Sequence, residues 1–294
     1  MISEFYKGLD FPDEACRVLQ ESYEIMTANS EAAELLRKAE DSFFAEGDES
    51  FSDFLQKTAD ITGVHRFVVD MVFLLMCAGR LRGLYDDRGL SRELFWDTLR
   101  DLRYKLIECH DVYGVWGTFV TGWFKCFFTL GRFALGRLQF ERASLRYDDY
   151  RGFAVRGHEV VNFHIPSSGA LTPESVLDSL HRAYEFYRDE CLTDGIMLFT
   201  CYSWLIYPPQ YKVYPEGSNL QKFYNMFDIV EAYESDDFGD FWRVFNMEYS
   251  PEAIDRAPTD TRLRRNLISY IKEGSRMGCG FGIIAYDGTK IIKL

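Results

Sequence analysis

Several common catalytic motifs are missing from this 294-residue sequence. It contains no Gly-x-Ser-x-Gly elbow, no P-loop and no Rossmann glycine triplet, which argues against the usual serine hydrolases, P-loop enzymes and dinucleotide-binding enzymes. The histidines are few and lack the spacing of metal ligands, so we expect no metal site. They are His65, His110, His158, His164 and His181.

Paired cysteines and a secretory signal are also absent. The seven cysteines are odd in number, scattered, and form no Cys-x-x-Cys pair. The first residues, MISEFYKGLDF, are polar and include acids early, unlike a signal peptide. We therefore expect reduced thiols, no disulfide framework and a cytoplasmic location.

No apolar run is long enough to cross a membrane. The two most apolar windows, FVVDMVFLLMCAG and VWGTFVTGWFKCFFTLG, are interrupted by Asp70 and Lys125. Neither reaches the ~20 apolar residues of a transmembrane helix. Both windows predict buried core helices, and no membrane partner is expected.

Excess positive charge is lacking. The formal net charge is -13, with 46 acidic against 33 basic residues, which argues against nucleic-acid binding. A small ligand carrying phosphate stays possible, because backbone N–H groups at a helix start can bind phosphate without cationic side chains. A hydrophobic fraction of 47% supplies ample core for the two domains that this length suggests.

Two regions of different character make up the chain. Residues 1–134 show helical hydrophobic spacing almost throughout, with helices expected at 11–29, 31–45, 51–62, 65–82, 91–109 and 115–130. From residue 135 short alternating segments begin, and they predict an antiparallel meander near 138–145, 152–156 and 159–165. The fold class is therefore α+β, with an all-α domain at 1–134 and a sheet domain at 135–294.

The second region continues with helices and strands in alternation. A helix is predicted at 173–188, an apolar strand at 196–207, a helix at 218–227, a strand at 228–235 and a helix at 261–273. Asp287-Gly288 is typical of a tight hairpin turn near the end of the chain.

The stretch VVNFHIPSSGALTPESVLDSL (160–180) passes from a strand through a small-residue loop into a helix. Thr172 is a suitable N-cap and Pro173 a suitable first helical residue. Backbone N–H groups at such a junction favour an anion. The alternative is an ordinary strand–loop–helix connection, in which Glu174 itself uses the helix dipole.

Four segments together resemble a protein family. They are LGRLQFE (135–141), VVNFHIPSSGALTPESVLDSL (160–180), CYSWLI (201–206) and SNLQKFYNMF (218–227). In this order and spacing they resemble bacterial acyltransferase-like proteins, in which a helical N-acyltransferase N-terminal domain precedes a GNAT-like C-terminal domain. The resemblance covers most of the chain. It implies a mixed GNAT-like sheet flanked by helices at 135–294.

The resemblance also implies where an acyl-CoA or acetyl-CoA co-substrate would bind. In the wider GNAT superfamily, the loop after the fourth strand binds the CoA pyrophosphate. The matching loop here has one glycine and no arginine, so its donors would be backbone N–H groups and hydroxyls. The backbone at Phe163 and Ile165 would pair with the pantetheine arm, and Asn219 would hydrogen-bond its amide. The loop residues are Ser167, Ser168, Gly169, Ala170, Leu171 and Thr172.

Two residues are candidates for proton transfer. His164 lies at a strand end beside the loop, and an imidazole titrates near neutral pH, so it is the candidate base. Tyr224 matches, by resemblance, the tyrosine that protonates the departing thiolate. The alternatives are a structural histidine, a tyrosine packed on the sheet, and a nucleophilic Cys201–His164 pair that no third residue supports.

The function expected on these grounds is direct acyl transfer from acyl-CoA to an amine or hydroxyl of a small acceptor. The acidic run YESDDFGDF (233–241) is either a solvated loop or an attractor for a cationic amine. The alternative function is a non-catalytic binding or sensor protein on a degenerate GNAT-like fold.

Overall fold

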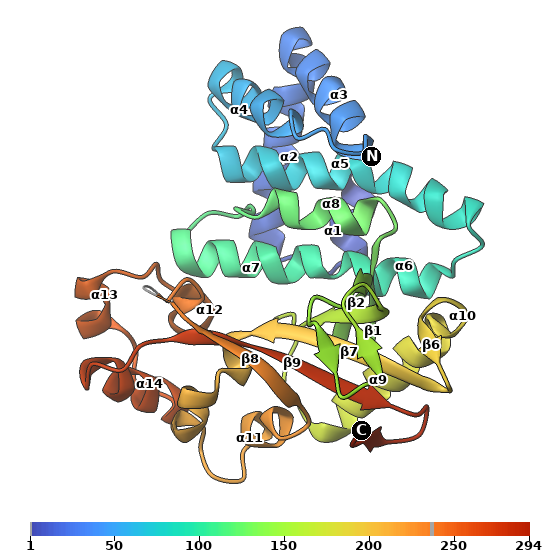
Figure 1. The fold of residues 1–294 in the computed structure, drawn as a ribbon. Helices are drawn as coiled ribbons and strands as arrows, with labels where there is room; N and C mark the ends of the chain where they lie inside the picture. The colour runs from blue at the N-terminus through green and yellow to red at the C-terminus, as the bar shows by residue number, and fades with distance from the viewer. Residues whose placement is uncertain (1, 236–237) are drawn as a thin grey trace. The chain divides into compact units, whose positions relative to one another are not determined.

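The computed structural model describes residues 2–235 and 238–294. The chain divides into two compact units, residues 1–133 and 134–294. In Figure 1 the colour bar runs from the blue helices of the first unit to the red strand near the end of the second. Each unit has its own architecture and is described by itself.

The first unit is helical and its core is rich in phenylalanine. Phe43 makes edge-on contacts with Phe51, Phe73 and Phe128, with ring centroids 5.1, 5.3 and 5.5 Å away. The predicted helix 91–109 is divided in two, at Arg100. The elements are α1 (Ser3–Gly8), α2 (Asp13–Ala28), α3 (Ser30–Phe44), α4 (Phe51–Thr62), α5 (Arg66–Asp87), α6 (Arg92–Leu99), α7 (Asp101–Tyr113), η1 (Thr121–Phe124) and α8 (Lys125–Phe128).

The two charges that interrupt the apolar windows both have partners inside this unit. Asp70 is buried on α5 and forms an ion pair with Arg66, one turn earlier, whose Nε lies 2.8 Å from Asp70 Oδ1. Burial raises the pKa of the Asp70 carboxyl to about 6, although Arg66 opposes this shift. Lys125 pairs with Glu49 at 3.0 Å. In the described residues no single helix is long and apolar enough to span a membrane, and only the sharply bent pair α4 and α5 meets the length and composition test together.

The second unit is built on an eight-stranded mixed sheet. The main order is β1-β2-β5-β7-β9-β10, with β6 paired to β7 and β8 paired to β9. The strands are β1 (Arg132–Leu135), β2 (Leu138–Ser144), β3 (Asp149–Tyr150), β4 (Ala154–Val155), β5 (Glu159–His164), β6 (Leu192–Thr193), β7 (Ile196–Ser203), β8 (Asp228–Glu234), β9 (Gly278–Tyr286) and β10 (Ile291–Ile292).

Helices flank this sheet and follow its strands along the chain. The longest is α9, which begins at Pro173 as predicted, with Thr172 Oγ1 accepting a 3.2 Å bond from the Ser175 N–H. The others are α10 (Arg188–Cys191), η2 (Trp204–Ile206), η3 (Pro208–Val213), α11 (Asn219–Tyr224), α12 (Phe241–Phe245), α13 (Pro251–Arg256) and α14 (Arg262–Lys272). The predicted α+β class is confirmed.

The predicted three-stranded meander is partly wrong. β2 pairs antiparallel with β5 directly, from Gln139 opposite His164 to Ser144 opposite Glu159. The segment between them forms a separate two-stranded sheet of β3 and β4. Its Tyr150 and Ala154 are buried in one apolar cluster with Val160 of β5. The alternation at 152–156 therefore reflects a small hairpin folded onto the sheet and not a strand within it.

Side chains alternate between the two faces of the sheet, and each face has its own covering. One face carries Val160 and Leu198 into the cluster beneath β3 and β4. On the other face Phe163 contacts Phe223 and Phe227, at and after α11, with centroids 6.5 and 5.9 Å apart. The α11 face also receives the short helix η2, which follows β7 directly.

Glycines on β9 allow η2 to approach the sheet closely. A Cβ at Gly280 would lie 2.2 Å from the Ile206 carbonyl oxygen of η2. One at Gly278 would lie 2.3 Å from the Tyr233 carbonyl oxygen of β8 and 2.7 Å from the ring of Tyr207, which follows η2 directly. Such distances are impossible for real side chains, so both positions need glycine. Trp204 and Leu205 of η2 are thereby held against the middle of the sheet.

Replacing Gly280 by alanine should destabilise the fold by about 2 kcal/mol or more, because the backbone at Ile206 must move away. Gly239→Ala is the matched control, since a Cβ there meets nothing within 4 Å. The measurement is the urea midpoint of each variant. Equal midpoints for the two variants would contradict the close packing of η2 on β9.

Candidate functional site

The strands β5 and β7 part from one another halfway along. They run parallel and pair Val161 with Phe199 and Asn162 with Thr200. In the described part of the chain the pairing ends there, although β5 continues to His164 and β7 to Ser203. A ligand can therefore reach backbone groups in the interior of the sheet at this point, where an unbroken ladder would occupy them.

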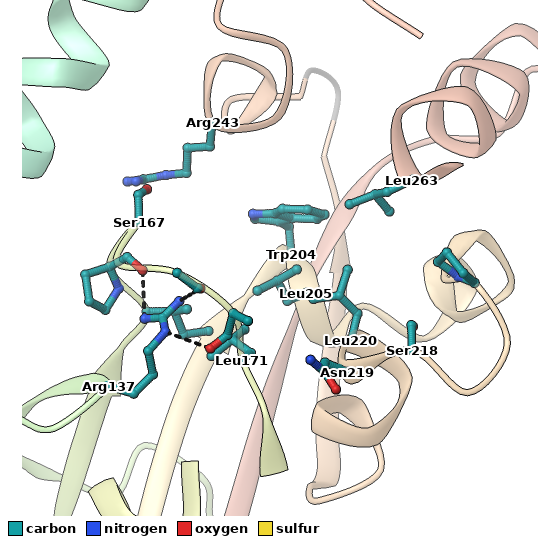
Figure 2. Close-up of a pocket in the computed structure, with 15 residues that line it drawn as sticks. Arg137, Ser167, Leu171, Trp204, Leu205, Ser218, Asn219, Leu220, Arg243 and Leu263 are labelled. Carbon is teal, nitrogen blue, oxygen red and sulfur yellow. Dashed lines mark hydrogen bonds between the residues drawn. The ribbon is translucent and has the colours of Figure 1, made fainter. Parts of the chain in front are cut away.

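A cavity of about 400 Å³ lies beside this opening, on the α11 face. Its walls come from the loop after β5, from η2 and from the start of α11 (Figure 2). Leu263 of α14 and Arg243 of α12 complete the lining. The walls are mainly apolar, with a few polar groups, as in most small-molecule sites.

Arg137 fixes the loop after β5 from one side. Its Nη1 donates to the Pro166 carbonyl oxygen at 2.8 Å, its Nη2 to that of Gly169 at 2.7 Å, and its Nε to that of Ala170 at 3.3 Å. Arg137 is itself positioned by the turn between β1 and β2, where its backbone N–H donates to Ser179 Oγ at 2.6 Å. Figure 2 shows the three bonds to the loop as dashed lines.

The bonds to Arg137 orient the N–H groups of the same peptides. In a planar trans peptide the N–H of one residue points opposite to the C=O of the residue before it. The N–H groups of Ser167, Ala170 and Leu171 therefore point away from Arg137. Gly169 has a φ of +111°, a backbone conformation that residues with a side chain rarely adopt. The loop thus has an acceptor side bound by Arg137 and a donor side suited to an anion.

The opposite face of the sheet carries a polar network at the same opening. His164 Nε2 lies 2.7 Å from Glu141 Oε1, and Asn162 Nδ2 donates to the same oxygen at 3.1 Å. Thr200 Oγ1 in turn donates to Asn162 Oδ1 at 3.2 Å. These four side chains come from β2, β5 and β7, so the network spans both strands that part.

The structure brings many of the predicted binding residues together. Of the predicted set, Ile165, Ser167, Gly169, Ala170, Leu171 and Asn219 all line the cavity. Ser168 and Thr172 do not line it, and Thr172 is the N-cap of α9. The Phe163 side chain is buried in the core, so only its backbone is available for the predicted role.

The two predicted catalytic residues lie on different sides of the sheet. His164 belongs to the polar network, whereas Tyr224 ends α11 and packs against Tyr211 with ring centroids 4.7 Å apart. Tyr224 does not line the cavity. Burial, and then the neighbouring Tyr211, raise the pKa of the Tyr224 phenol above its usual value. Its role as a proton donor stays a prediction.

The nucleophilic alternative is not supported. Thr200 faces the polar network, so the next residue, Cys201, points to the other face of the sheet from His164. Cys201 is fully buried, and burial raises the pKa of its thiol far above the usual range. None of the seven cysteines, which all lie within the described residues, forms a disulfide. A reactive thiolate requires a lowered pKa, which Cys201 lacks.

Two further predictions concern metals and charge. No group of three or more histidine, cysteine, aspartate or glutamate side chains that could hold a metal occurs in residues 2–235 and 238–294. In the acidic run 233–241, Asp236 and Asp237 lie outside the described residues. Its role in attracting a cationic substrate stays a prediction.

Sequence reasoning missed Arg137, Glu141, Asn162, Trp204 and Arg243. Arg137 and Glu141 both occur in LGRLQFE, and their alternation with Gln139 could have placed Glu141 beside His164. Arg243 lies in a five-residue helix far along the chain, and no local pattern connects it with the loop after β5.

Comparisons with known proteins extend this picture. A family model of the GNAT-like C-terminal domain matches residues 133–284, and one of the N-acyltransferase N-terminal domain matches residues 1–130. No curated protein matches the sequence.

Solved structures share the fold. An acyltransferase in complex with decanoyl-CoA and teicoplanin aligns with a TM-score of 0.74 at 20% identity, over 96% of this chain and 86% of that chain. A mutant acyltransferase in complex with octanoyl-CoA aligns with a TM-score of 0.72 at 20% identity, over 95% of this chain and 86% of that chain. An acyltransferase in complex with decanoyl-CoA aligns with a TM-score of 0.62 at 19% identity, over 96% of this chain and 98% of that chain.

Replacing Arg137 by methionine should free the loop after β5, because methionine keeps the apolar stem but donates no hydrogen bond. Loss of three bonds from a charged donor should speed backbone amide exchange at residues 167–171 by about tenfold or more. The measurement is hydrogen–deuterium exchange. Arg188→Met is the control, since Arg188 is exposed and pairs with Glu185, which lies outside the loop. Unchanged exchange at 167–171 would contradict the loop-fixing role.

Proposed function

We propose a function for this chain from one premise: it belongs to the family in which an N-acyltransferase N-terminal domain precedes a GNAT-like C-terminal domain. The chain transfers an acyl group from acyl-CoA to an amine or hydroxyl of a small acceptor. The observation that carries this proposal is the parting of β5 and β7 between a cavity on one face and a titratable network on the other.

The two faces divide the reaction between two substrates. The acyl-CoA lies on the cavity side, with its diphosphate at the donor side of the loop Ser167–Leu171 and its pantetheine arm beside Asn219. The pantetheine amides pair with backbone groups of β5 that β7 leaves unpaired beyond Asn162. The thioester then lies in the opening itself, where the acceptor reaches it from the His164 side.

The chemistry is a direct displacement. The acceptor nitrogen or oxygen attacks the thioester carbonyl carbon, and its proton passes to His164. A backbone N–H of β5 stabilises the oxyanion that forms. The carbon–sulfur bond then breaks, and the CoA thiolate accepts a proton. We assign Tyr224 as the donor of that proton. One amide or ester bond has formed and one thioester bond has been lost.

Glu141 fixes the tautomer of the proposed base. An ionised carboxylate only accepts hydrogen bonds, so His164 Nε2 donates to Glu141 Oε1 across the 2.7 Å contact. Nδ1 is then the basic nitrogen of the ring. The carboxylate also stabilises the imidazolium that forms when the proton arrives, as in other histidine–carboxylate pairs.

The acceptor is a small molecule, not nucleic acid. The net charge of -13 opposes a polyanionic partner and favours an acceptor with a cationic amine. One neighbour was solved with both decanoyl-CoA and teicoplanin, which supports an organic acceptor and a medium-chain donor as first assays. A CoA thioester as co-substrate accords with a cytoplasmic location.

The binding half of the proposal predicts a thermal shift. Decanoyl-CoA should raise the melting temperature of the protein, since a ligand at 100 times its Kd stabilises by ~2.7 kcal/mol. Differential scanning fluorimetry with acetyl-, octanoyl- and decanoyl-CoA at millimolar concentration is the measurement. Decanoic acid and ATP serve as controls for the acyl chain and the nucleotide. No shift with any acyl-CoA would end the proposal.

A sensor or binding protein is the second candidate. The loop after β5 carries one glycine and no arginine, and this departure from the GNAT pattern favours a protein that has kept binding and lost catalysis. The two candidates differ in turnover. Binding of acyl-CoA without CoA release, tested against a panel of amines and alcohols, would favour the sensor.

Replacing His164 by glutamine should lower kcat by about 10²–10⁴-fold, because the acceptor loses its base. Glu141→Gln should lower it less, since the imidazole remains. Tyr224→Phe tests the proton donor in the same assay and should leave the Kd for CoA unchanged. The measurement is thiol release under saturating acyl-CoA. A His164→Gln variant with wild-type kcat would remove His164 from the mechanism.

A further inference from the structure

Arg243 is a second arginine at the cavity, and the sequence did not predict it as a site residue. It comes from α12, which lies about 75 residues after the loop in the chain, yet it lines the same cavity as Ser167, Gly169 and Ala170. Figure 2 shows its guanidinium directed toward the Ser167 end of the loop. The figure also shows Arg137 and Arg243 on opposite sides of that loop.

The two arginines differ in what they bind. The Arg137 side chain donates hydrogen bonds to the loop carbonyls of Pro166, Gly169 and Ala170. Arg243 donates through Nε to Asp240 Oδ1 at 2.7 Å, and its guanidinium lies 4.2 Å from the centre of the Trp242 ring. Among the described residues no hydrogen bond involves Arg243 Nη1 or Nη2. Asp240 and Trp242 thus fix the guanidinium while its two terminal nitrogens stay available.

The charge around the cavity is the reverse of that of the whole chain. The chain carries a net charge of -13, but the residues that line the cavity include two arginines and no aspartate or glutamate. Asp240 accepts its hydrogen bond from Nε, so within the described residues the Nη1 and Nη2 edge keeps its donors. An anion in this cavity would meet an arginine edge on one side and the N–H groups of Ser167, Ala170 and Leu171 on the other.

We propose that Arg243 binds the diphosphate of CoA and so supplies, from α12, the guanidinium that the loop after β5 lacks. Asp240 is its positioning residue. This inference rests on the proposed function, because it concerns the same acyl-CoA site. It also explains why a loop with one glycine and no arginine is compatible with a phosphate-bearing ligand: the cation arrives from a distant segment.

The test compares a CoA thioester with one that lacks the 3′-phosphate and with a pantetheine thioester that lacks the whole 3′-phospho-ADP group. Isothermal titration of wild type and Arg243→Ala uses decanoyl-CoA, 3′-dephospho-decanoyl-CoA and S-decanoyl-pantetheine. Loss of one charge-assisted arginine contact should raise the Kd of both CoA thioesters by about tenfold to a hundredfold. The pantetheine thioester should bind both proteins equally. Arg243→Lys should recover part of the affinity, and Asp240→Asn should lose part of it.

Arg276→Ala is the matched control, since Arg276 is exposed, pairs with Glu234 and does not line this cavity. Circular dichroism checks that each variant is folded. Equal affinity of wild type and Arg243→Ala for decanoyl-CoA would overturn the inference while leaving the proposed function intact. A loss confined to the ligand with the 3′-phosphate would also overturn it. Failure of wild type to bind any of the three ligands would instead reject the proposed function.

Discussion

The site depends on two parallel strands that pair at only two positions. A parallel pair is normally buried and continuous, since each unpaired peptide group inside a protein costs free energy. Here β5 and β7 pair at Val161–Phe199 and Asn162–Thr200 and then part. The parting needs support on the outer edges, and β2 and β9 provide it by pairing with β5 and β7 along most of their lengths. The opening is thus held between two regular ladders.

Each face of the opening is built by residues that cannot reach the other. Asn162 and His164 point to the network face, while Phe163 points into the phenylalanine core beneath α11. This alternation follows from the period of a strand. A reaction that needs a thioester held on one side and a base on the other suits such a site, because the sheet itself keeps the two sets of groups apart until the substrate joins them.

The sequence predicted regular elements well where the periodic pattern of hydrophobic residues extended over many residues. α3, α4 and α9 lie close to their expected bounds, and the turn at Asp287-Gly288 joins β9 to β10. It failed where tertiary contacts decide the outcome. The hairpin of β3 and β4 has the alternation of a sheet strand, and only its packing on Val160 shows its true place. Short helices such as α12 have too few residues for a period to appear.

The candidate site divides in the same way. The loop Ser167–Leu171 was readable because strand, glycine and N-cap follow one another locally. Its arginine partners were not, because Arg137 contacts the loop through carbonyls about 30 residues away and Arg243 comes from still farther along the chain. A search for arginine within the loop sequence finds only cations that are close in the chain. Folding can bring an arginine to the loop from a distant segment.

The glycines of β9 have a consequence for how this cavity can change in evolution or by design. Gly280 leaves no space between the strand and the Ile206 carbonyl, so the floor formed by η2 cannot be raised or lowered by substitution from beneath. Room for a larger or smaller ligand must instead come from the side chains that line the cavity, such as Leu220 of α11 and Leu263 of α14. Selectivity would then drift through helix residues, while the sheet beneath stays constant.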